Sequence, residues 1–379
     1  MTKGEGQMRI FLLLFGGYIL YLAFEYIFGK VWKKHLSVSL YCKKDCLYEG
    51  EQIELIEEVR NQKFLPIPAV KIKFTIDRSW VEQEKAGRNH VTDQYYRNDL
   101  LSVGSYEQIQ RKLAFICTKR GYYVLGAMDV FVSNFFYSKE YVFRINEEQW
   151  VYVFPRRCHS TELEFVHKKI LGEIYARRNL LEDPFSFAGI RDYQSYDGMN
   201  RVNWKASAKT GELKVNRLES TTDVSIHIIL YFQEHNGNWD TQIEEYLIRL
   251  TATIAEELLK DGIQVTLSSN GCDVETGMQV CVKAGAGEHH IDSIDRGLAR
   301  IDLKQGGSKI IDFASIFEEE KELVILLTDC QSESFLEKLT NVVPQDRSFF
   351  WIFPHYRSAS IAIKENLRKY LITICIDEL

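Results

Sequence analysis

The pattern of hydrophobic and polar positions divides the chain into three kinds of segment. A continuous apolar run, IFLLLFGGYILYLAFEYIF, occupies residues 10–28 and contains one charge, Glu25. From about residue 36 to 155 apolar and polar residues alternate, which is the pattern of strands that bury one face. From residue 223 onward, short continuous apolar runs alternate with amphipathic stretches, as in a parallel sheet covered by helices.

The apolar run predicts a membrane-spanning helix over residues 10–29, preceded by a tail at residues 1–9. Tyrosines within the run and Trp32 beyond it are typical of rings at the headgroup level. The following sequence, FEYIFGKVWKK, lacks the small-x-small cleavage site of a signal peptide. We therefore expect an anchor that contacts membrane lipid through residues 10–29.

The charges that flank this segment predict its orientation. Lys30, Lys33 and Lys34 follow it, whereas Lys3 and Arg9 precede it. The positive-inside rule then places the soluble domains in the cytoplasm of a single-pass protein of the cell membrane. The eight cysteines are scattered without a C-x-x-C pair, which agrees with a reducing compartment.

The region 36–155 predicts an antiparallel β-sandwich, because short alternating runs are separated by turns and no strong helical pattern interrupts them. We expect this domain to act as a spacer or an interaction domain. The expected strands are LSVSLYC, EQIELIEEVRN, VKIKFTI, YEQIQRKLAFIC, GYYVLGAMDVFVS and WVYVF.

The region 223–379 predicts a doubly wound α/β domain. The amphipathic stretch TQIEEYLIRLTATIAEELLKDG predicts a helix that ends at Gly262, and SESFLEKLTNVV predicts another. Residues 156–222 form a connecting region that we expect to pack on this domain. The expected strands are VSIHIILYF, IQVTLSS, KELVILLTD and SFFWIFP.

The stretch RVNWKASAKTGELKVNRLE, residues 201–219, predicts a short helix followed by a strand. Asp197 or Asn200 can cap the start of the helix, and Gly211 can end it in the left-handed conformation. Trp204 shares a face with small residues, so we expect its ring to pack closely on a sheet.

Cations recur along this stretch, and they allow two interpretations. They can pair with local acids as an ordinary solvated face, where each exposed pair contributes roughly 0.2–1 kcal/mol. They can also dock on an acidic partner or on anionic lipid headgroups. The net charge of −6 provides no global field for nucleic acid, so no nucleic-acid partner is expected. The candidate binding residues are Arg191, Arg201, Lys205, Lys209, Lys214 and Arg217.

The longer segment FAGIRDYQSYDGMNRVNWKASAKTGELKVNRLE resembles the signature of the bacterial family named domain of unknown function 58 (DUF58). The resemblance implies an N-terminal membrane segment, a β-domain, the signature, and a von Willebrand factor A-like α/β domain. It also implies a MoxR-type AAA+ ATPase as partner, and it implies no known reaction. The chain departs from the family in its short DGMN segment and its one membrane span. The signature residues with an expected structural role are Gly189, Tyr193, Asp197, Asn203, Trp204, Gly211 and Glu212.

A von Willebrand A-like domain can hold a cation through a D-x-S-x-S loop after its first strand. This chain has YFQEH at residues 231–235 instead, although Thr328 and Asp329 match the later acidic position. One carboxylate without the serine loop is a poor site for a hard cation. We therefore expect a degenerate site without metal, and no cofactor.

Enzyme chemistry finds little support in the sequence. Ser207 and Thr210 have no histidine near them, no G-x-S-x-G motif occurs, and AKTG inverts the end of a Walker A motif. The sequence favours a non-catalytic membrane-anchored scaffold or adaptor that works with the ATPase on membrane or envelope proteins. The alternative is a hydrolase that uses the signature region, residues 189–219.

Overall fold

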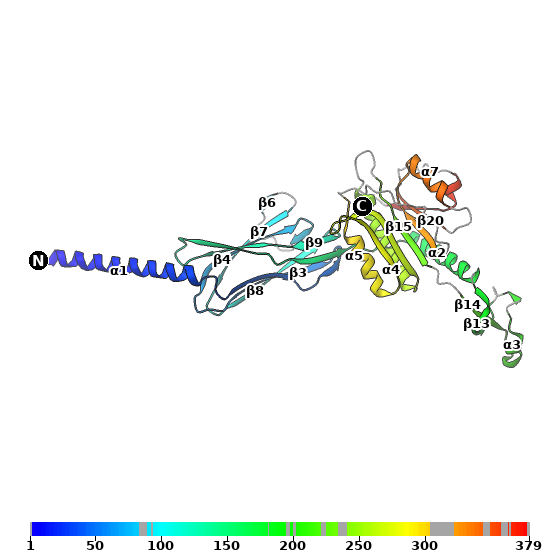
Figure 1. The fold of residues 1–379 in the computed structure, drawn as a ribbon, viewed down its shortest axis with the longest axis horizontal. Coiled ribbons are helices and arrows are strands. Elements are labelled where there is room, and N and C mark those ends of the chain that lie inside the picture. The colour runs from blue at the N-terminus through cyan, green and yellow to red at the C-terminus, as the bar shows by residue number, and fades with distance from the viewer. Residues whose placement is uncertain are drawn as a thin grey trace. The chain divides into compact units, whose positions relative to one another are not determined.

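The computed structural model divides the chain into two compact units, Met1–Phe154 and Pro155–Leu379 (Figure 1). The first unit carries the apolar helix and the sandwich, and the second carries the α/β sheet together with the signature segment. The described residues are 2–82, 89–91, 94–180, 182–194, 198–199, 202–220, 225–233, 241–303, 322–343, 349–357, 363 and 365–376.

Helix α1 (Thr2–Val31) contains the predicted apolar run. Its segment Ile10–Val31 is long and apolar enough to cross a membrane, with a mean hydropathy of 1.9. Side chains from Ile10 to Leu20 lie largely exposed, because no other part of the described chain covers them. The structure therefore confirms an N-terminal apolar helix, whose length and composition suit a membrane anchor or a signal sequence.

Unit 1 is a β-sandwich, as predicted, and its strands form three hydrogen-bonded sheets. The sheet orders are β1-β3-β8-β5, β11-β10-β4-β7-β6 and β2-β12-β9. The strands are β1 (Leu36–Cys42), β2 (Cys46–Tyr48), β3 (Gln52–Asn61), β4 (Ile67–Asp77), β5 (Trp80–Glu82), β6 (Asn89–Val91), β7 (Gln94–Val103), β8 (Gln108–Cys117), β9 (Gly121–Leu125), β10 (Met128–Ser133), β11 (Glu140–Ile145) and β12 (Gln149–Phe154).

Alternation along these strands builds the core of the sandwich. In β1 the side chains of Val38 and Leu40 are buried, and β10 buries Val130 and Val132 in the same way. The fully buried Trp80 fills the interior beside them. The two-residue period of a strand thus places one face of each sheet in a shared core.

Two details of the sandwich differ from the sequence-based expectation. The run GYYVLGAMDVFVS does not form one strand, because the chain leaves β9 at Gly126 and enters another sheet as β10. A glycine inside a strand pattern often marks such a break. The pairing of β2 with β12 is parallel, whereas the other paired strands of the described sandwich are antiparallel.

Unit 2 contains a mixed, mostly parallel sheet with the order β17-β16-β15-β19-β20-β21, and β18 pairs with β16. Edge strand β17 runs antiparallel to β16. The strands are β15 (Ser225–Leu230), β16 (Gln264–Asp273), β17 (Gln279–Gly285), β18 (Ile301–Asp302), β19 (Glu322–Leu327), β20 (Phe349–Tyr356) and β21 (Leu371–Ile376). The helices are α2 (Thr161–Leu180), α4 (Thr241–Lys260), α5 (Glu288–Ala299), α7 (Glu333–Val342) and α8 (Glu365–Arg368).

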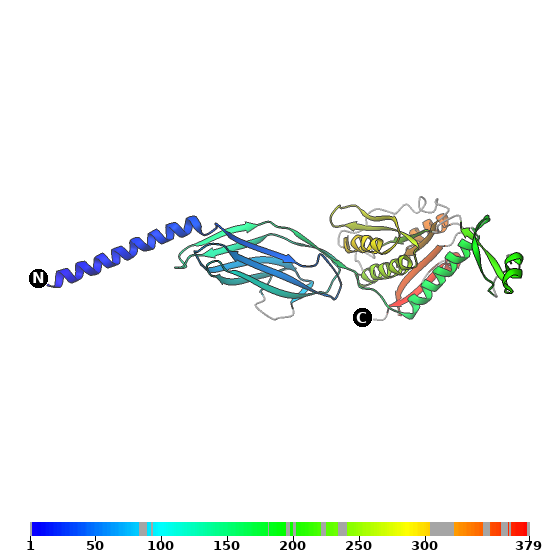
Figure 2. The same cartoon turned by 90° about the horizontal axis from the view of Figure 1, so that it is seen from below.

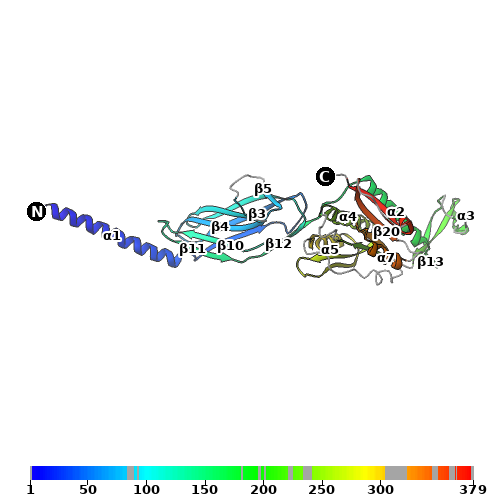
Figure 3. The ribbon, with the colours of Figure 1, turned by 90° about the horizontal axis from the view of Figure 1, so that it is seen from above.

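Helices cover both faces of this sheet (Figure 2). On one face, Ile228 of β15 joins a core cluster with α2, α4 and α5. The neighbouring Ile229 joins the cluster on the other face, with α7 and α8. Consecutive residues of the central strand are therefore both buried, which is why its sequence reads as a continuous apolar run. The predicted connecting region contributes α2 to the first of these cores (Figure 3).

Candidate functional site

The signature segment folds as a two-stranded hairpin with a short helix in its connection. Strand β13 (Glu182–Asp192) pairs antiparallel with β14 (Lys214–Ser220), and α3 (Trp204–Thr210) lies between them. The hairpin register places Arg191 opposite Val215 and Asp192 opposite Lys214. We call the described residues 189–216 the signature module.

The caps of α3 explain why so short a helix is stable. The side chain of Asn203 accepts a hydrogen bond from the backbone N–H of Ala206 at 2.9 Å. Gly211 ends the helix with a φ of 76°, and its N–H donates to the carbonyl of Ser207 at 2.9 Å. Gly211 is therefore the predicted left-handed stop, whereas the observed N-cap is Asn203. Asp197 and Asn200, the predicted caps, lie outside the described residues.

Polar contacts tie α3 to β14. The Asn203 amide donates to the side-chain oxygen of Asn216 at 2.6 Å. The Ser207 hydroxyl donates to the Asn203 carbonyl at 2.8 Å and accepts from the Lys214 N–H at 2.8 Å. Beneath them Val202 and Val215 form an isolated bridge and are buried. These contacts hold the helix in a fixed position on the hairpin.

Lys214 is bound inside the module. Its ammonium pairs with Asp192 and, at 3.3 Å, with Glu212. These two carboxylates, Asp192 foremost, raise the pKa of Lys214 above its usual value. For this residue the interpretation as a local ion pair therefore holds. Glu212, one of the signature residues, has its role in this pair.

Trp204 corrects one sequence-based expectation. We expected its ring to pack closely on a sheet, but the side chain is 62% exposed. Helix α3 has only seven residues, and none of them is buried. Trp204 is also the first residue of α3, and the hydrogen bonds to β14 come from Asn203 and Ser207 instead. The tryptophan is thus displayed to solvent on a capped, anchored helix.

Other candidate residues differ in how they are placed. Lys205 and Lys209 are exposed, and their spacing of four puts them on one face of α3. Arg191 is half-buried and donates to the Asp192 carbonyl at 3.1 Å. Tyr193 follows β13, with its N–H donating to the Leu213 carbonyl, and Gly189 pairs with Arg217 in the hairpin. Arg201 and the side chain of Arg217 lie outside the described part of the chain.

Exposed apolar side chains complete the module, and the sequence analysis missed them. Ile190, Met199 and Leu213 join Trp204 among the large hydrophobic residues that face solvent. Their signal was the presence of large apolar residues in a highly charged segment. Exposed apolar surface with a polar rim is typical of protein interaction sites.

Hydrogen bonds close the ends of the neighbouring strands β15 and β19, where Thr328 and Asp329 lie. The Asn270 side chain donates to the Phe232 carbonyl and accepts from the Phe232 N–H, each at 2.8 Å. The Thr328 hydroxyl accepts from the Cys330 N–H at 3.1 Å, and Thr328 and Asp329 are both buried. Among the described residues, no group of three histidine, cysteine or acidic side chains could hold a metal.

A buried ion network near the start of unit 2 was not predicted. The Arg157 guanidinium binds Asp295 of α5 at 2.6 Å and also pairs with Glu256 of α4. Glu256 in turn binds Lys260 at 2.5 Å. Burial raises the pKa of Asp295 to about 6, although its bond to Arg157 opposes the rise. Arg157 thus joins α4 to α5.

Comparisons with known proteins find likeness for part of the chain. No protein-family model matches it, and no curated protein matches it. The sandwich resembles the CARDB domain of PF1109 from Pyrococcus furiosus, with 18% identity over 31% of this chain and 91% of that one, at a TM-score of 0.20. The human CEP192 PapD-like domain 7 is similar to it with 14% identity over 30% and 84%, at a TM-score of 0.17. Spo0M from Bacillus subtilis is similar with 12% identity over 42% of this chain and 58% of that one, at a TM-score of 0.19.

Proposed function

We propose that this chain is a non-catalytic, membrane-anchored scaffold or adaptor that captures an acidic partner protein with its signature module. The observation that carries the proposal is the solvent-facing Trp204, held on a capped helix beside Lys205 and Lys209. Tryptophan is enriched among the residues that dominate binding energy at interfaces. Neighbouring cations speed the encounter with an acidic surface and select for it.

Rigidity of the module also supports docking. The Asn203 and Ser207 contacts with β14 fix α3 before any partner arrives. A surface that is ordered in advance loses less conformational entropy when it binds. The partner that we propose is a MoxR-type AAA+ ATPase, on the strength of the sequence resemblance, and the clients are membrane or envelope proteins. The scaffold would face the cytoplasm, as the lysines after the helix predict.

The topology of unit 2 supports a von Willebrand A-like assignment of its sheet. When the strands of this sheet other than β18 are renumbered from 1 to 6 in chain order, their order in the sheet is 3-2-1-4-5-6, as in doubly wound folds. Strand 3 of this numbering is β17, which is the antiparallel edge strand. The ends of the central strands are closed by the Asn270 and Thr328 hydrogen bonds.

The hydrolase alternative has weaker support. Nucleophilic serine needs a base within hydrogen-bond reach. The Ser207 hydroxyl is instead engaged by the backbone of Asn203 and Lys214, and residues 189–219 contain no histidine. The geometry gives this serine a structural role.

The experiment that tests the proposal is cross-linking of the tagged full chain in native membranes, followed by purification and identification of bound proteins. We expect wild type to recover a AAA+ ATPase. The double variant Lys205→Glu/Lys209→Glu should lose it, because like charges would then face the acidic partner. Trp204→Ala should also lose most of it.

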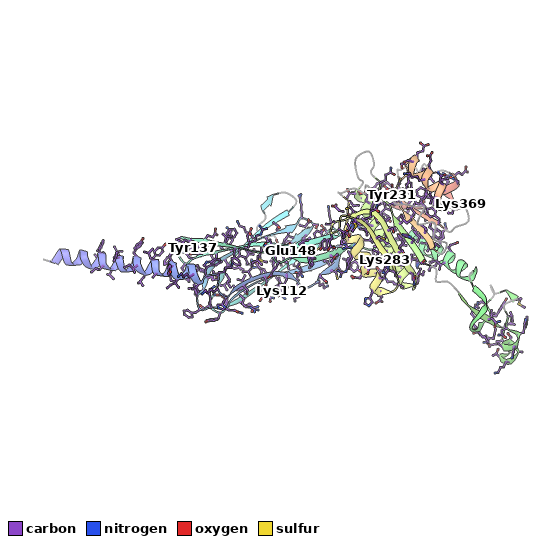
Figure 4. All side chains as sticks on the ribbon, viewed as in Figure 1. Lys112, Tyr137, Glu148, Tyr231, Lys283 and Lys369 are labelled. Atoms are coloured by element: carbon purple, nitrogen blue, oxygen red, sulfur yellow. The ribbon has the colours of Figure 1, made fainter. Side chains whose placement is uncertain are left out.

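Matched controls come from surfaces outside the module. Lys283→Glu/Lys338→Glu makes the same change in charge at two exposed lysines of unit 2 (Lys283 is labelled in Figure 4). Trp150→Ala removes another exposed tryptophan, which is 52% exposed on β12. Both controls should keep the ATPase. Its absence from the wild-type sample, or equal recovery with the charge-reversed module, would contradict the proposal.

A further inference from the structure

The sandwich has one end that is chemically unlike the other. Three loops at the end where α1 enters carry exposed aromatic side chains. Loops 43–45 and 146–148 at the opposite end carry exposed charged and polar residues, although Tyr48 and Trp150 are exposed on the strands next to them. Figure 4 shows Tyr137 at the end near α1 and Glu148 farther away. We name the aromatic residues the aromatic tip: Phe64, Tyr106, Phe135, Phe136 and Tyr137, with Phe64 81% and Tyr137 67% exposed.

Hydrogen bonds connect the tip loops with one another and with the end of α1. The Lys63 ammonium donates to the carbonyl of Lys34 at 2.9 Å and also to that of Trp32. The Tyr106 N–H donates to the Lys63 carbonyl at 3.1 Å. The loops around Phe64 and Tyr106 therefore lie beside the point where the apolar helix ends.

The loop 134–139 reaches farther along the helix. The Phe136 ring contacts Tyr21 edge-on at 4.9 Å, and its centroid lies 5.9 Å from that of Phe24. Glu25 of the helix binds Lys139 at 2.8 Å and accepts from the Asn134 amide at 2.6 Å. The charge in the apolar helix is thus neutralised by the loop itself, which lowers the cost of bringing this region into an apolar environment.

Helix length then sets the depth of this loop. From Ile10 to Leu20, before the first contact with Phe136, the helix rises only about 16 Å at ~1.5 Å per residue. The hydrocarbon core of a bilayer is ~30 Å thick. A membrane that encloses the apolar helix from Ile10 onward therefore also reaches the level of Tyr21 and Phe24, where Phe136 lies, unless it thins strongly.

An apolar groove at this level suits an acyl chain. It has a volume of about 580 Å³ and is lined by Gly17, Leu20, Tyr21, Phe24, Ile27 and Phe136. Exposed lysines at positions 30, 33 and 34 lie just beyond it, where anionic headgroups would be. Aromatic rings next to a basic rim are the composition of membrane interfaces.

We propose that the aromatic tip is a membrane-contact surface, inserted at the headgroup–acyl boundary of the same bilayer that holds α1. This inference rests on the proposed membrane anchor. It adds that unit 1 is seated against the lipid by its loops, so that the anchor does not act as a free tether. The alternative occupant of the groove is a second copy of this chain.

The test places a photoreactive benzoylphenylalanine at single positions of the full chain, in vesicles that contain a clickable phospholipid. Position Tyr137 reports on the tip, Leu14 on the exposed part of the helix, and Tyr48 on the opposite end of the sandwich. We expect lipid adducts at 137 and at 14, and background at 48. An aromatic probe replaces an aromatic residue at 137 and 48, so folding is preserved there.

The outcomes separate the two claims. A lipid adduct at 14 with none at 137 would overturn the inference and leave the membrane anchor standing. Cross-linked protein dimers at 137 in place of lipid adducts would assign the tip to a second copy of the chain. No lipid adduct at 14 or at 137 would contradict the anchor as well as the tip.

Discussion

Replacing Arg157 by methionine should destabilise unit 2, and the size of the loss should depend on pH. The Arg157 side chain is only 13% exposed, and that of its partner Asp295 only 2%. Arg157→Met keeps most of the apolar stem but removes the guanidinium, which leaves the carboxylate buried without its cation. Breaking a buried pair in this way costs about 3–5 kcal/mol.

The protonation of Asp295 gives the pH dependence. With the arginine present, its pKa is already raised to about 6, chiefly by burial. Without the arginine, the pKa should rise further, because the bond that favours the charged form is gone. The carboxyl is then neutral at pH 5 and little charge is left unpaired. We expect the full loss at pH 8 and a much smaller loss at pH 5.

Hydrogen exchange of the full chain in detergent measures this locally. Amides of α4 and α5 report the opening free energy of the region that Arg157 joins. The matched control is Arg296→Met, which removes a surface pair with Asp292 on α5 and should cost below about 1 kcal/mol at both pH values. A loss below about 1 kcal/mol for Arg157→Met at pH 8, or a loss that is equal at both pH values, would refute the reasoning.

Three further results are expected. Asp295→Asn should remove a pH dependence of about 3 kcal/mol from the stability of unit 2. Because the pKa of Asp295 is raised in the folded protein, its carboxyl contributes stability at low pH that is lost as the pH rises from about 4 through 6. A pH series of hydrogen exchange in which the variant matches wild type would contradict this. Trp204→Ala should leave the melting temperature nearly unchanged, because the ring is exposed and its removal forms no large cavity. Unfolding of this variant at physiological temperature would show instead that the ring is buried in the folded protein. A reporter fused after the last residue should be active in the cytoplasm, as the lysines after α1 predict, and activity only on the outer side would reverse the topology.

The hydrophobic pattern predicted the strands and helices that pack in the core of each unit. The strand Ser225–Leu230 was expected because it lies in a continuous apolar run, and the helix Thr241–Lys260 was expected because its apolar positions repeat with the helical period. The apolar helix at the N-terminus was equally clear from its length. Edge and late elements were missed: β17 buries only Val280 of its seven residues and so has a weak pattern, whereas β21 buries every second residue and was overlooked despite its regular alternation.

The candidate site was predicted in outline and corrected in its detail. Gly211 could be recognised as a helix stop because a left-handed residue after a helix is usually glycine. The exposure of Trp204 could not be recognised, since a seven-residue helix at a hairpin tip has little to pack against, and that depends on tertiary placement. Asp192 and Glu212 were expected among the local acids that pair with these cations, but their assignment to Lys214 was open, because Asp192 comes from the other strand, 22 residues earlier.

The central claim is that the signature module is a docking surface, and an equilibrium binding titration tests it most directly. The purified full chain would be titrated with the recovered ATPase at low and high salt, as wild type and as Lys205→Glu/Lys209→Glu. Affinity should fall as salt shortens the screening length from about 10 Å at 0.1 M to 3 Å at 1 M. The charge-reversed module should bind at least about tenfold more weakly at low salt, a difference of ~1.4 kcal/mol. Equal affinity of the two proteins at every salt concentration would contradict the claim and leave the lysines as a solvated face.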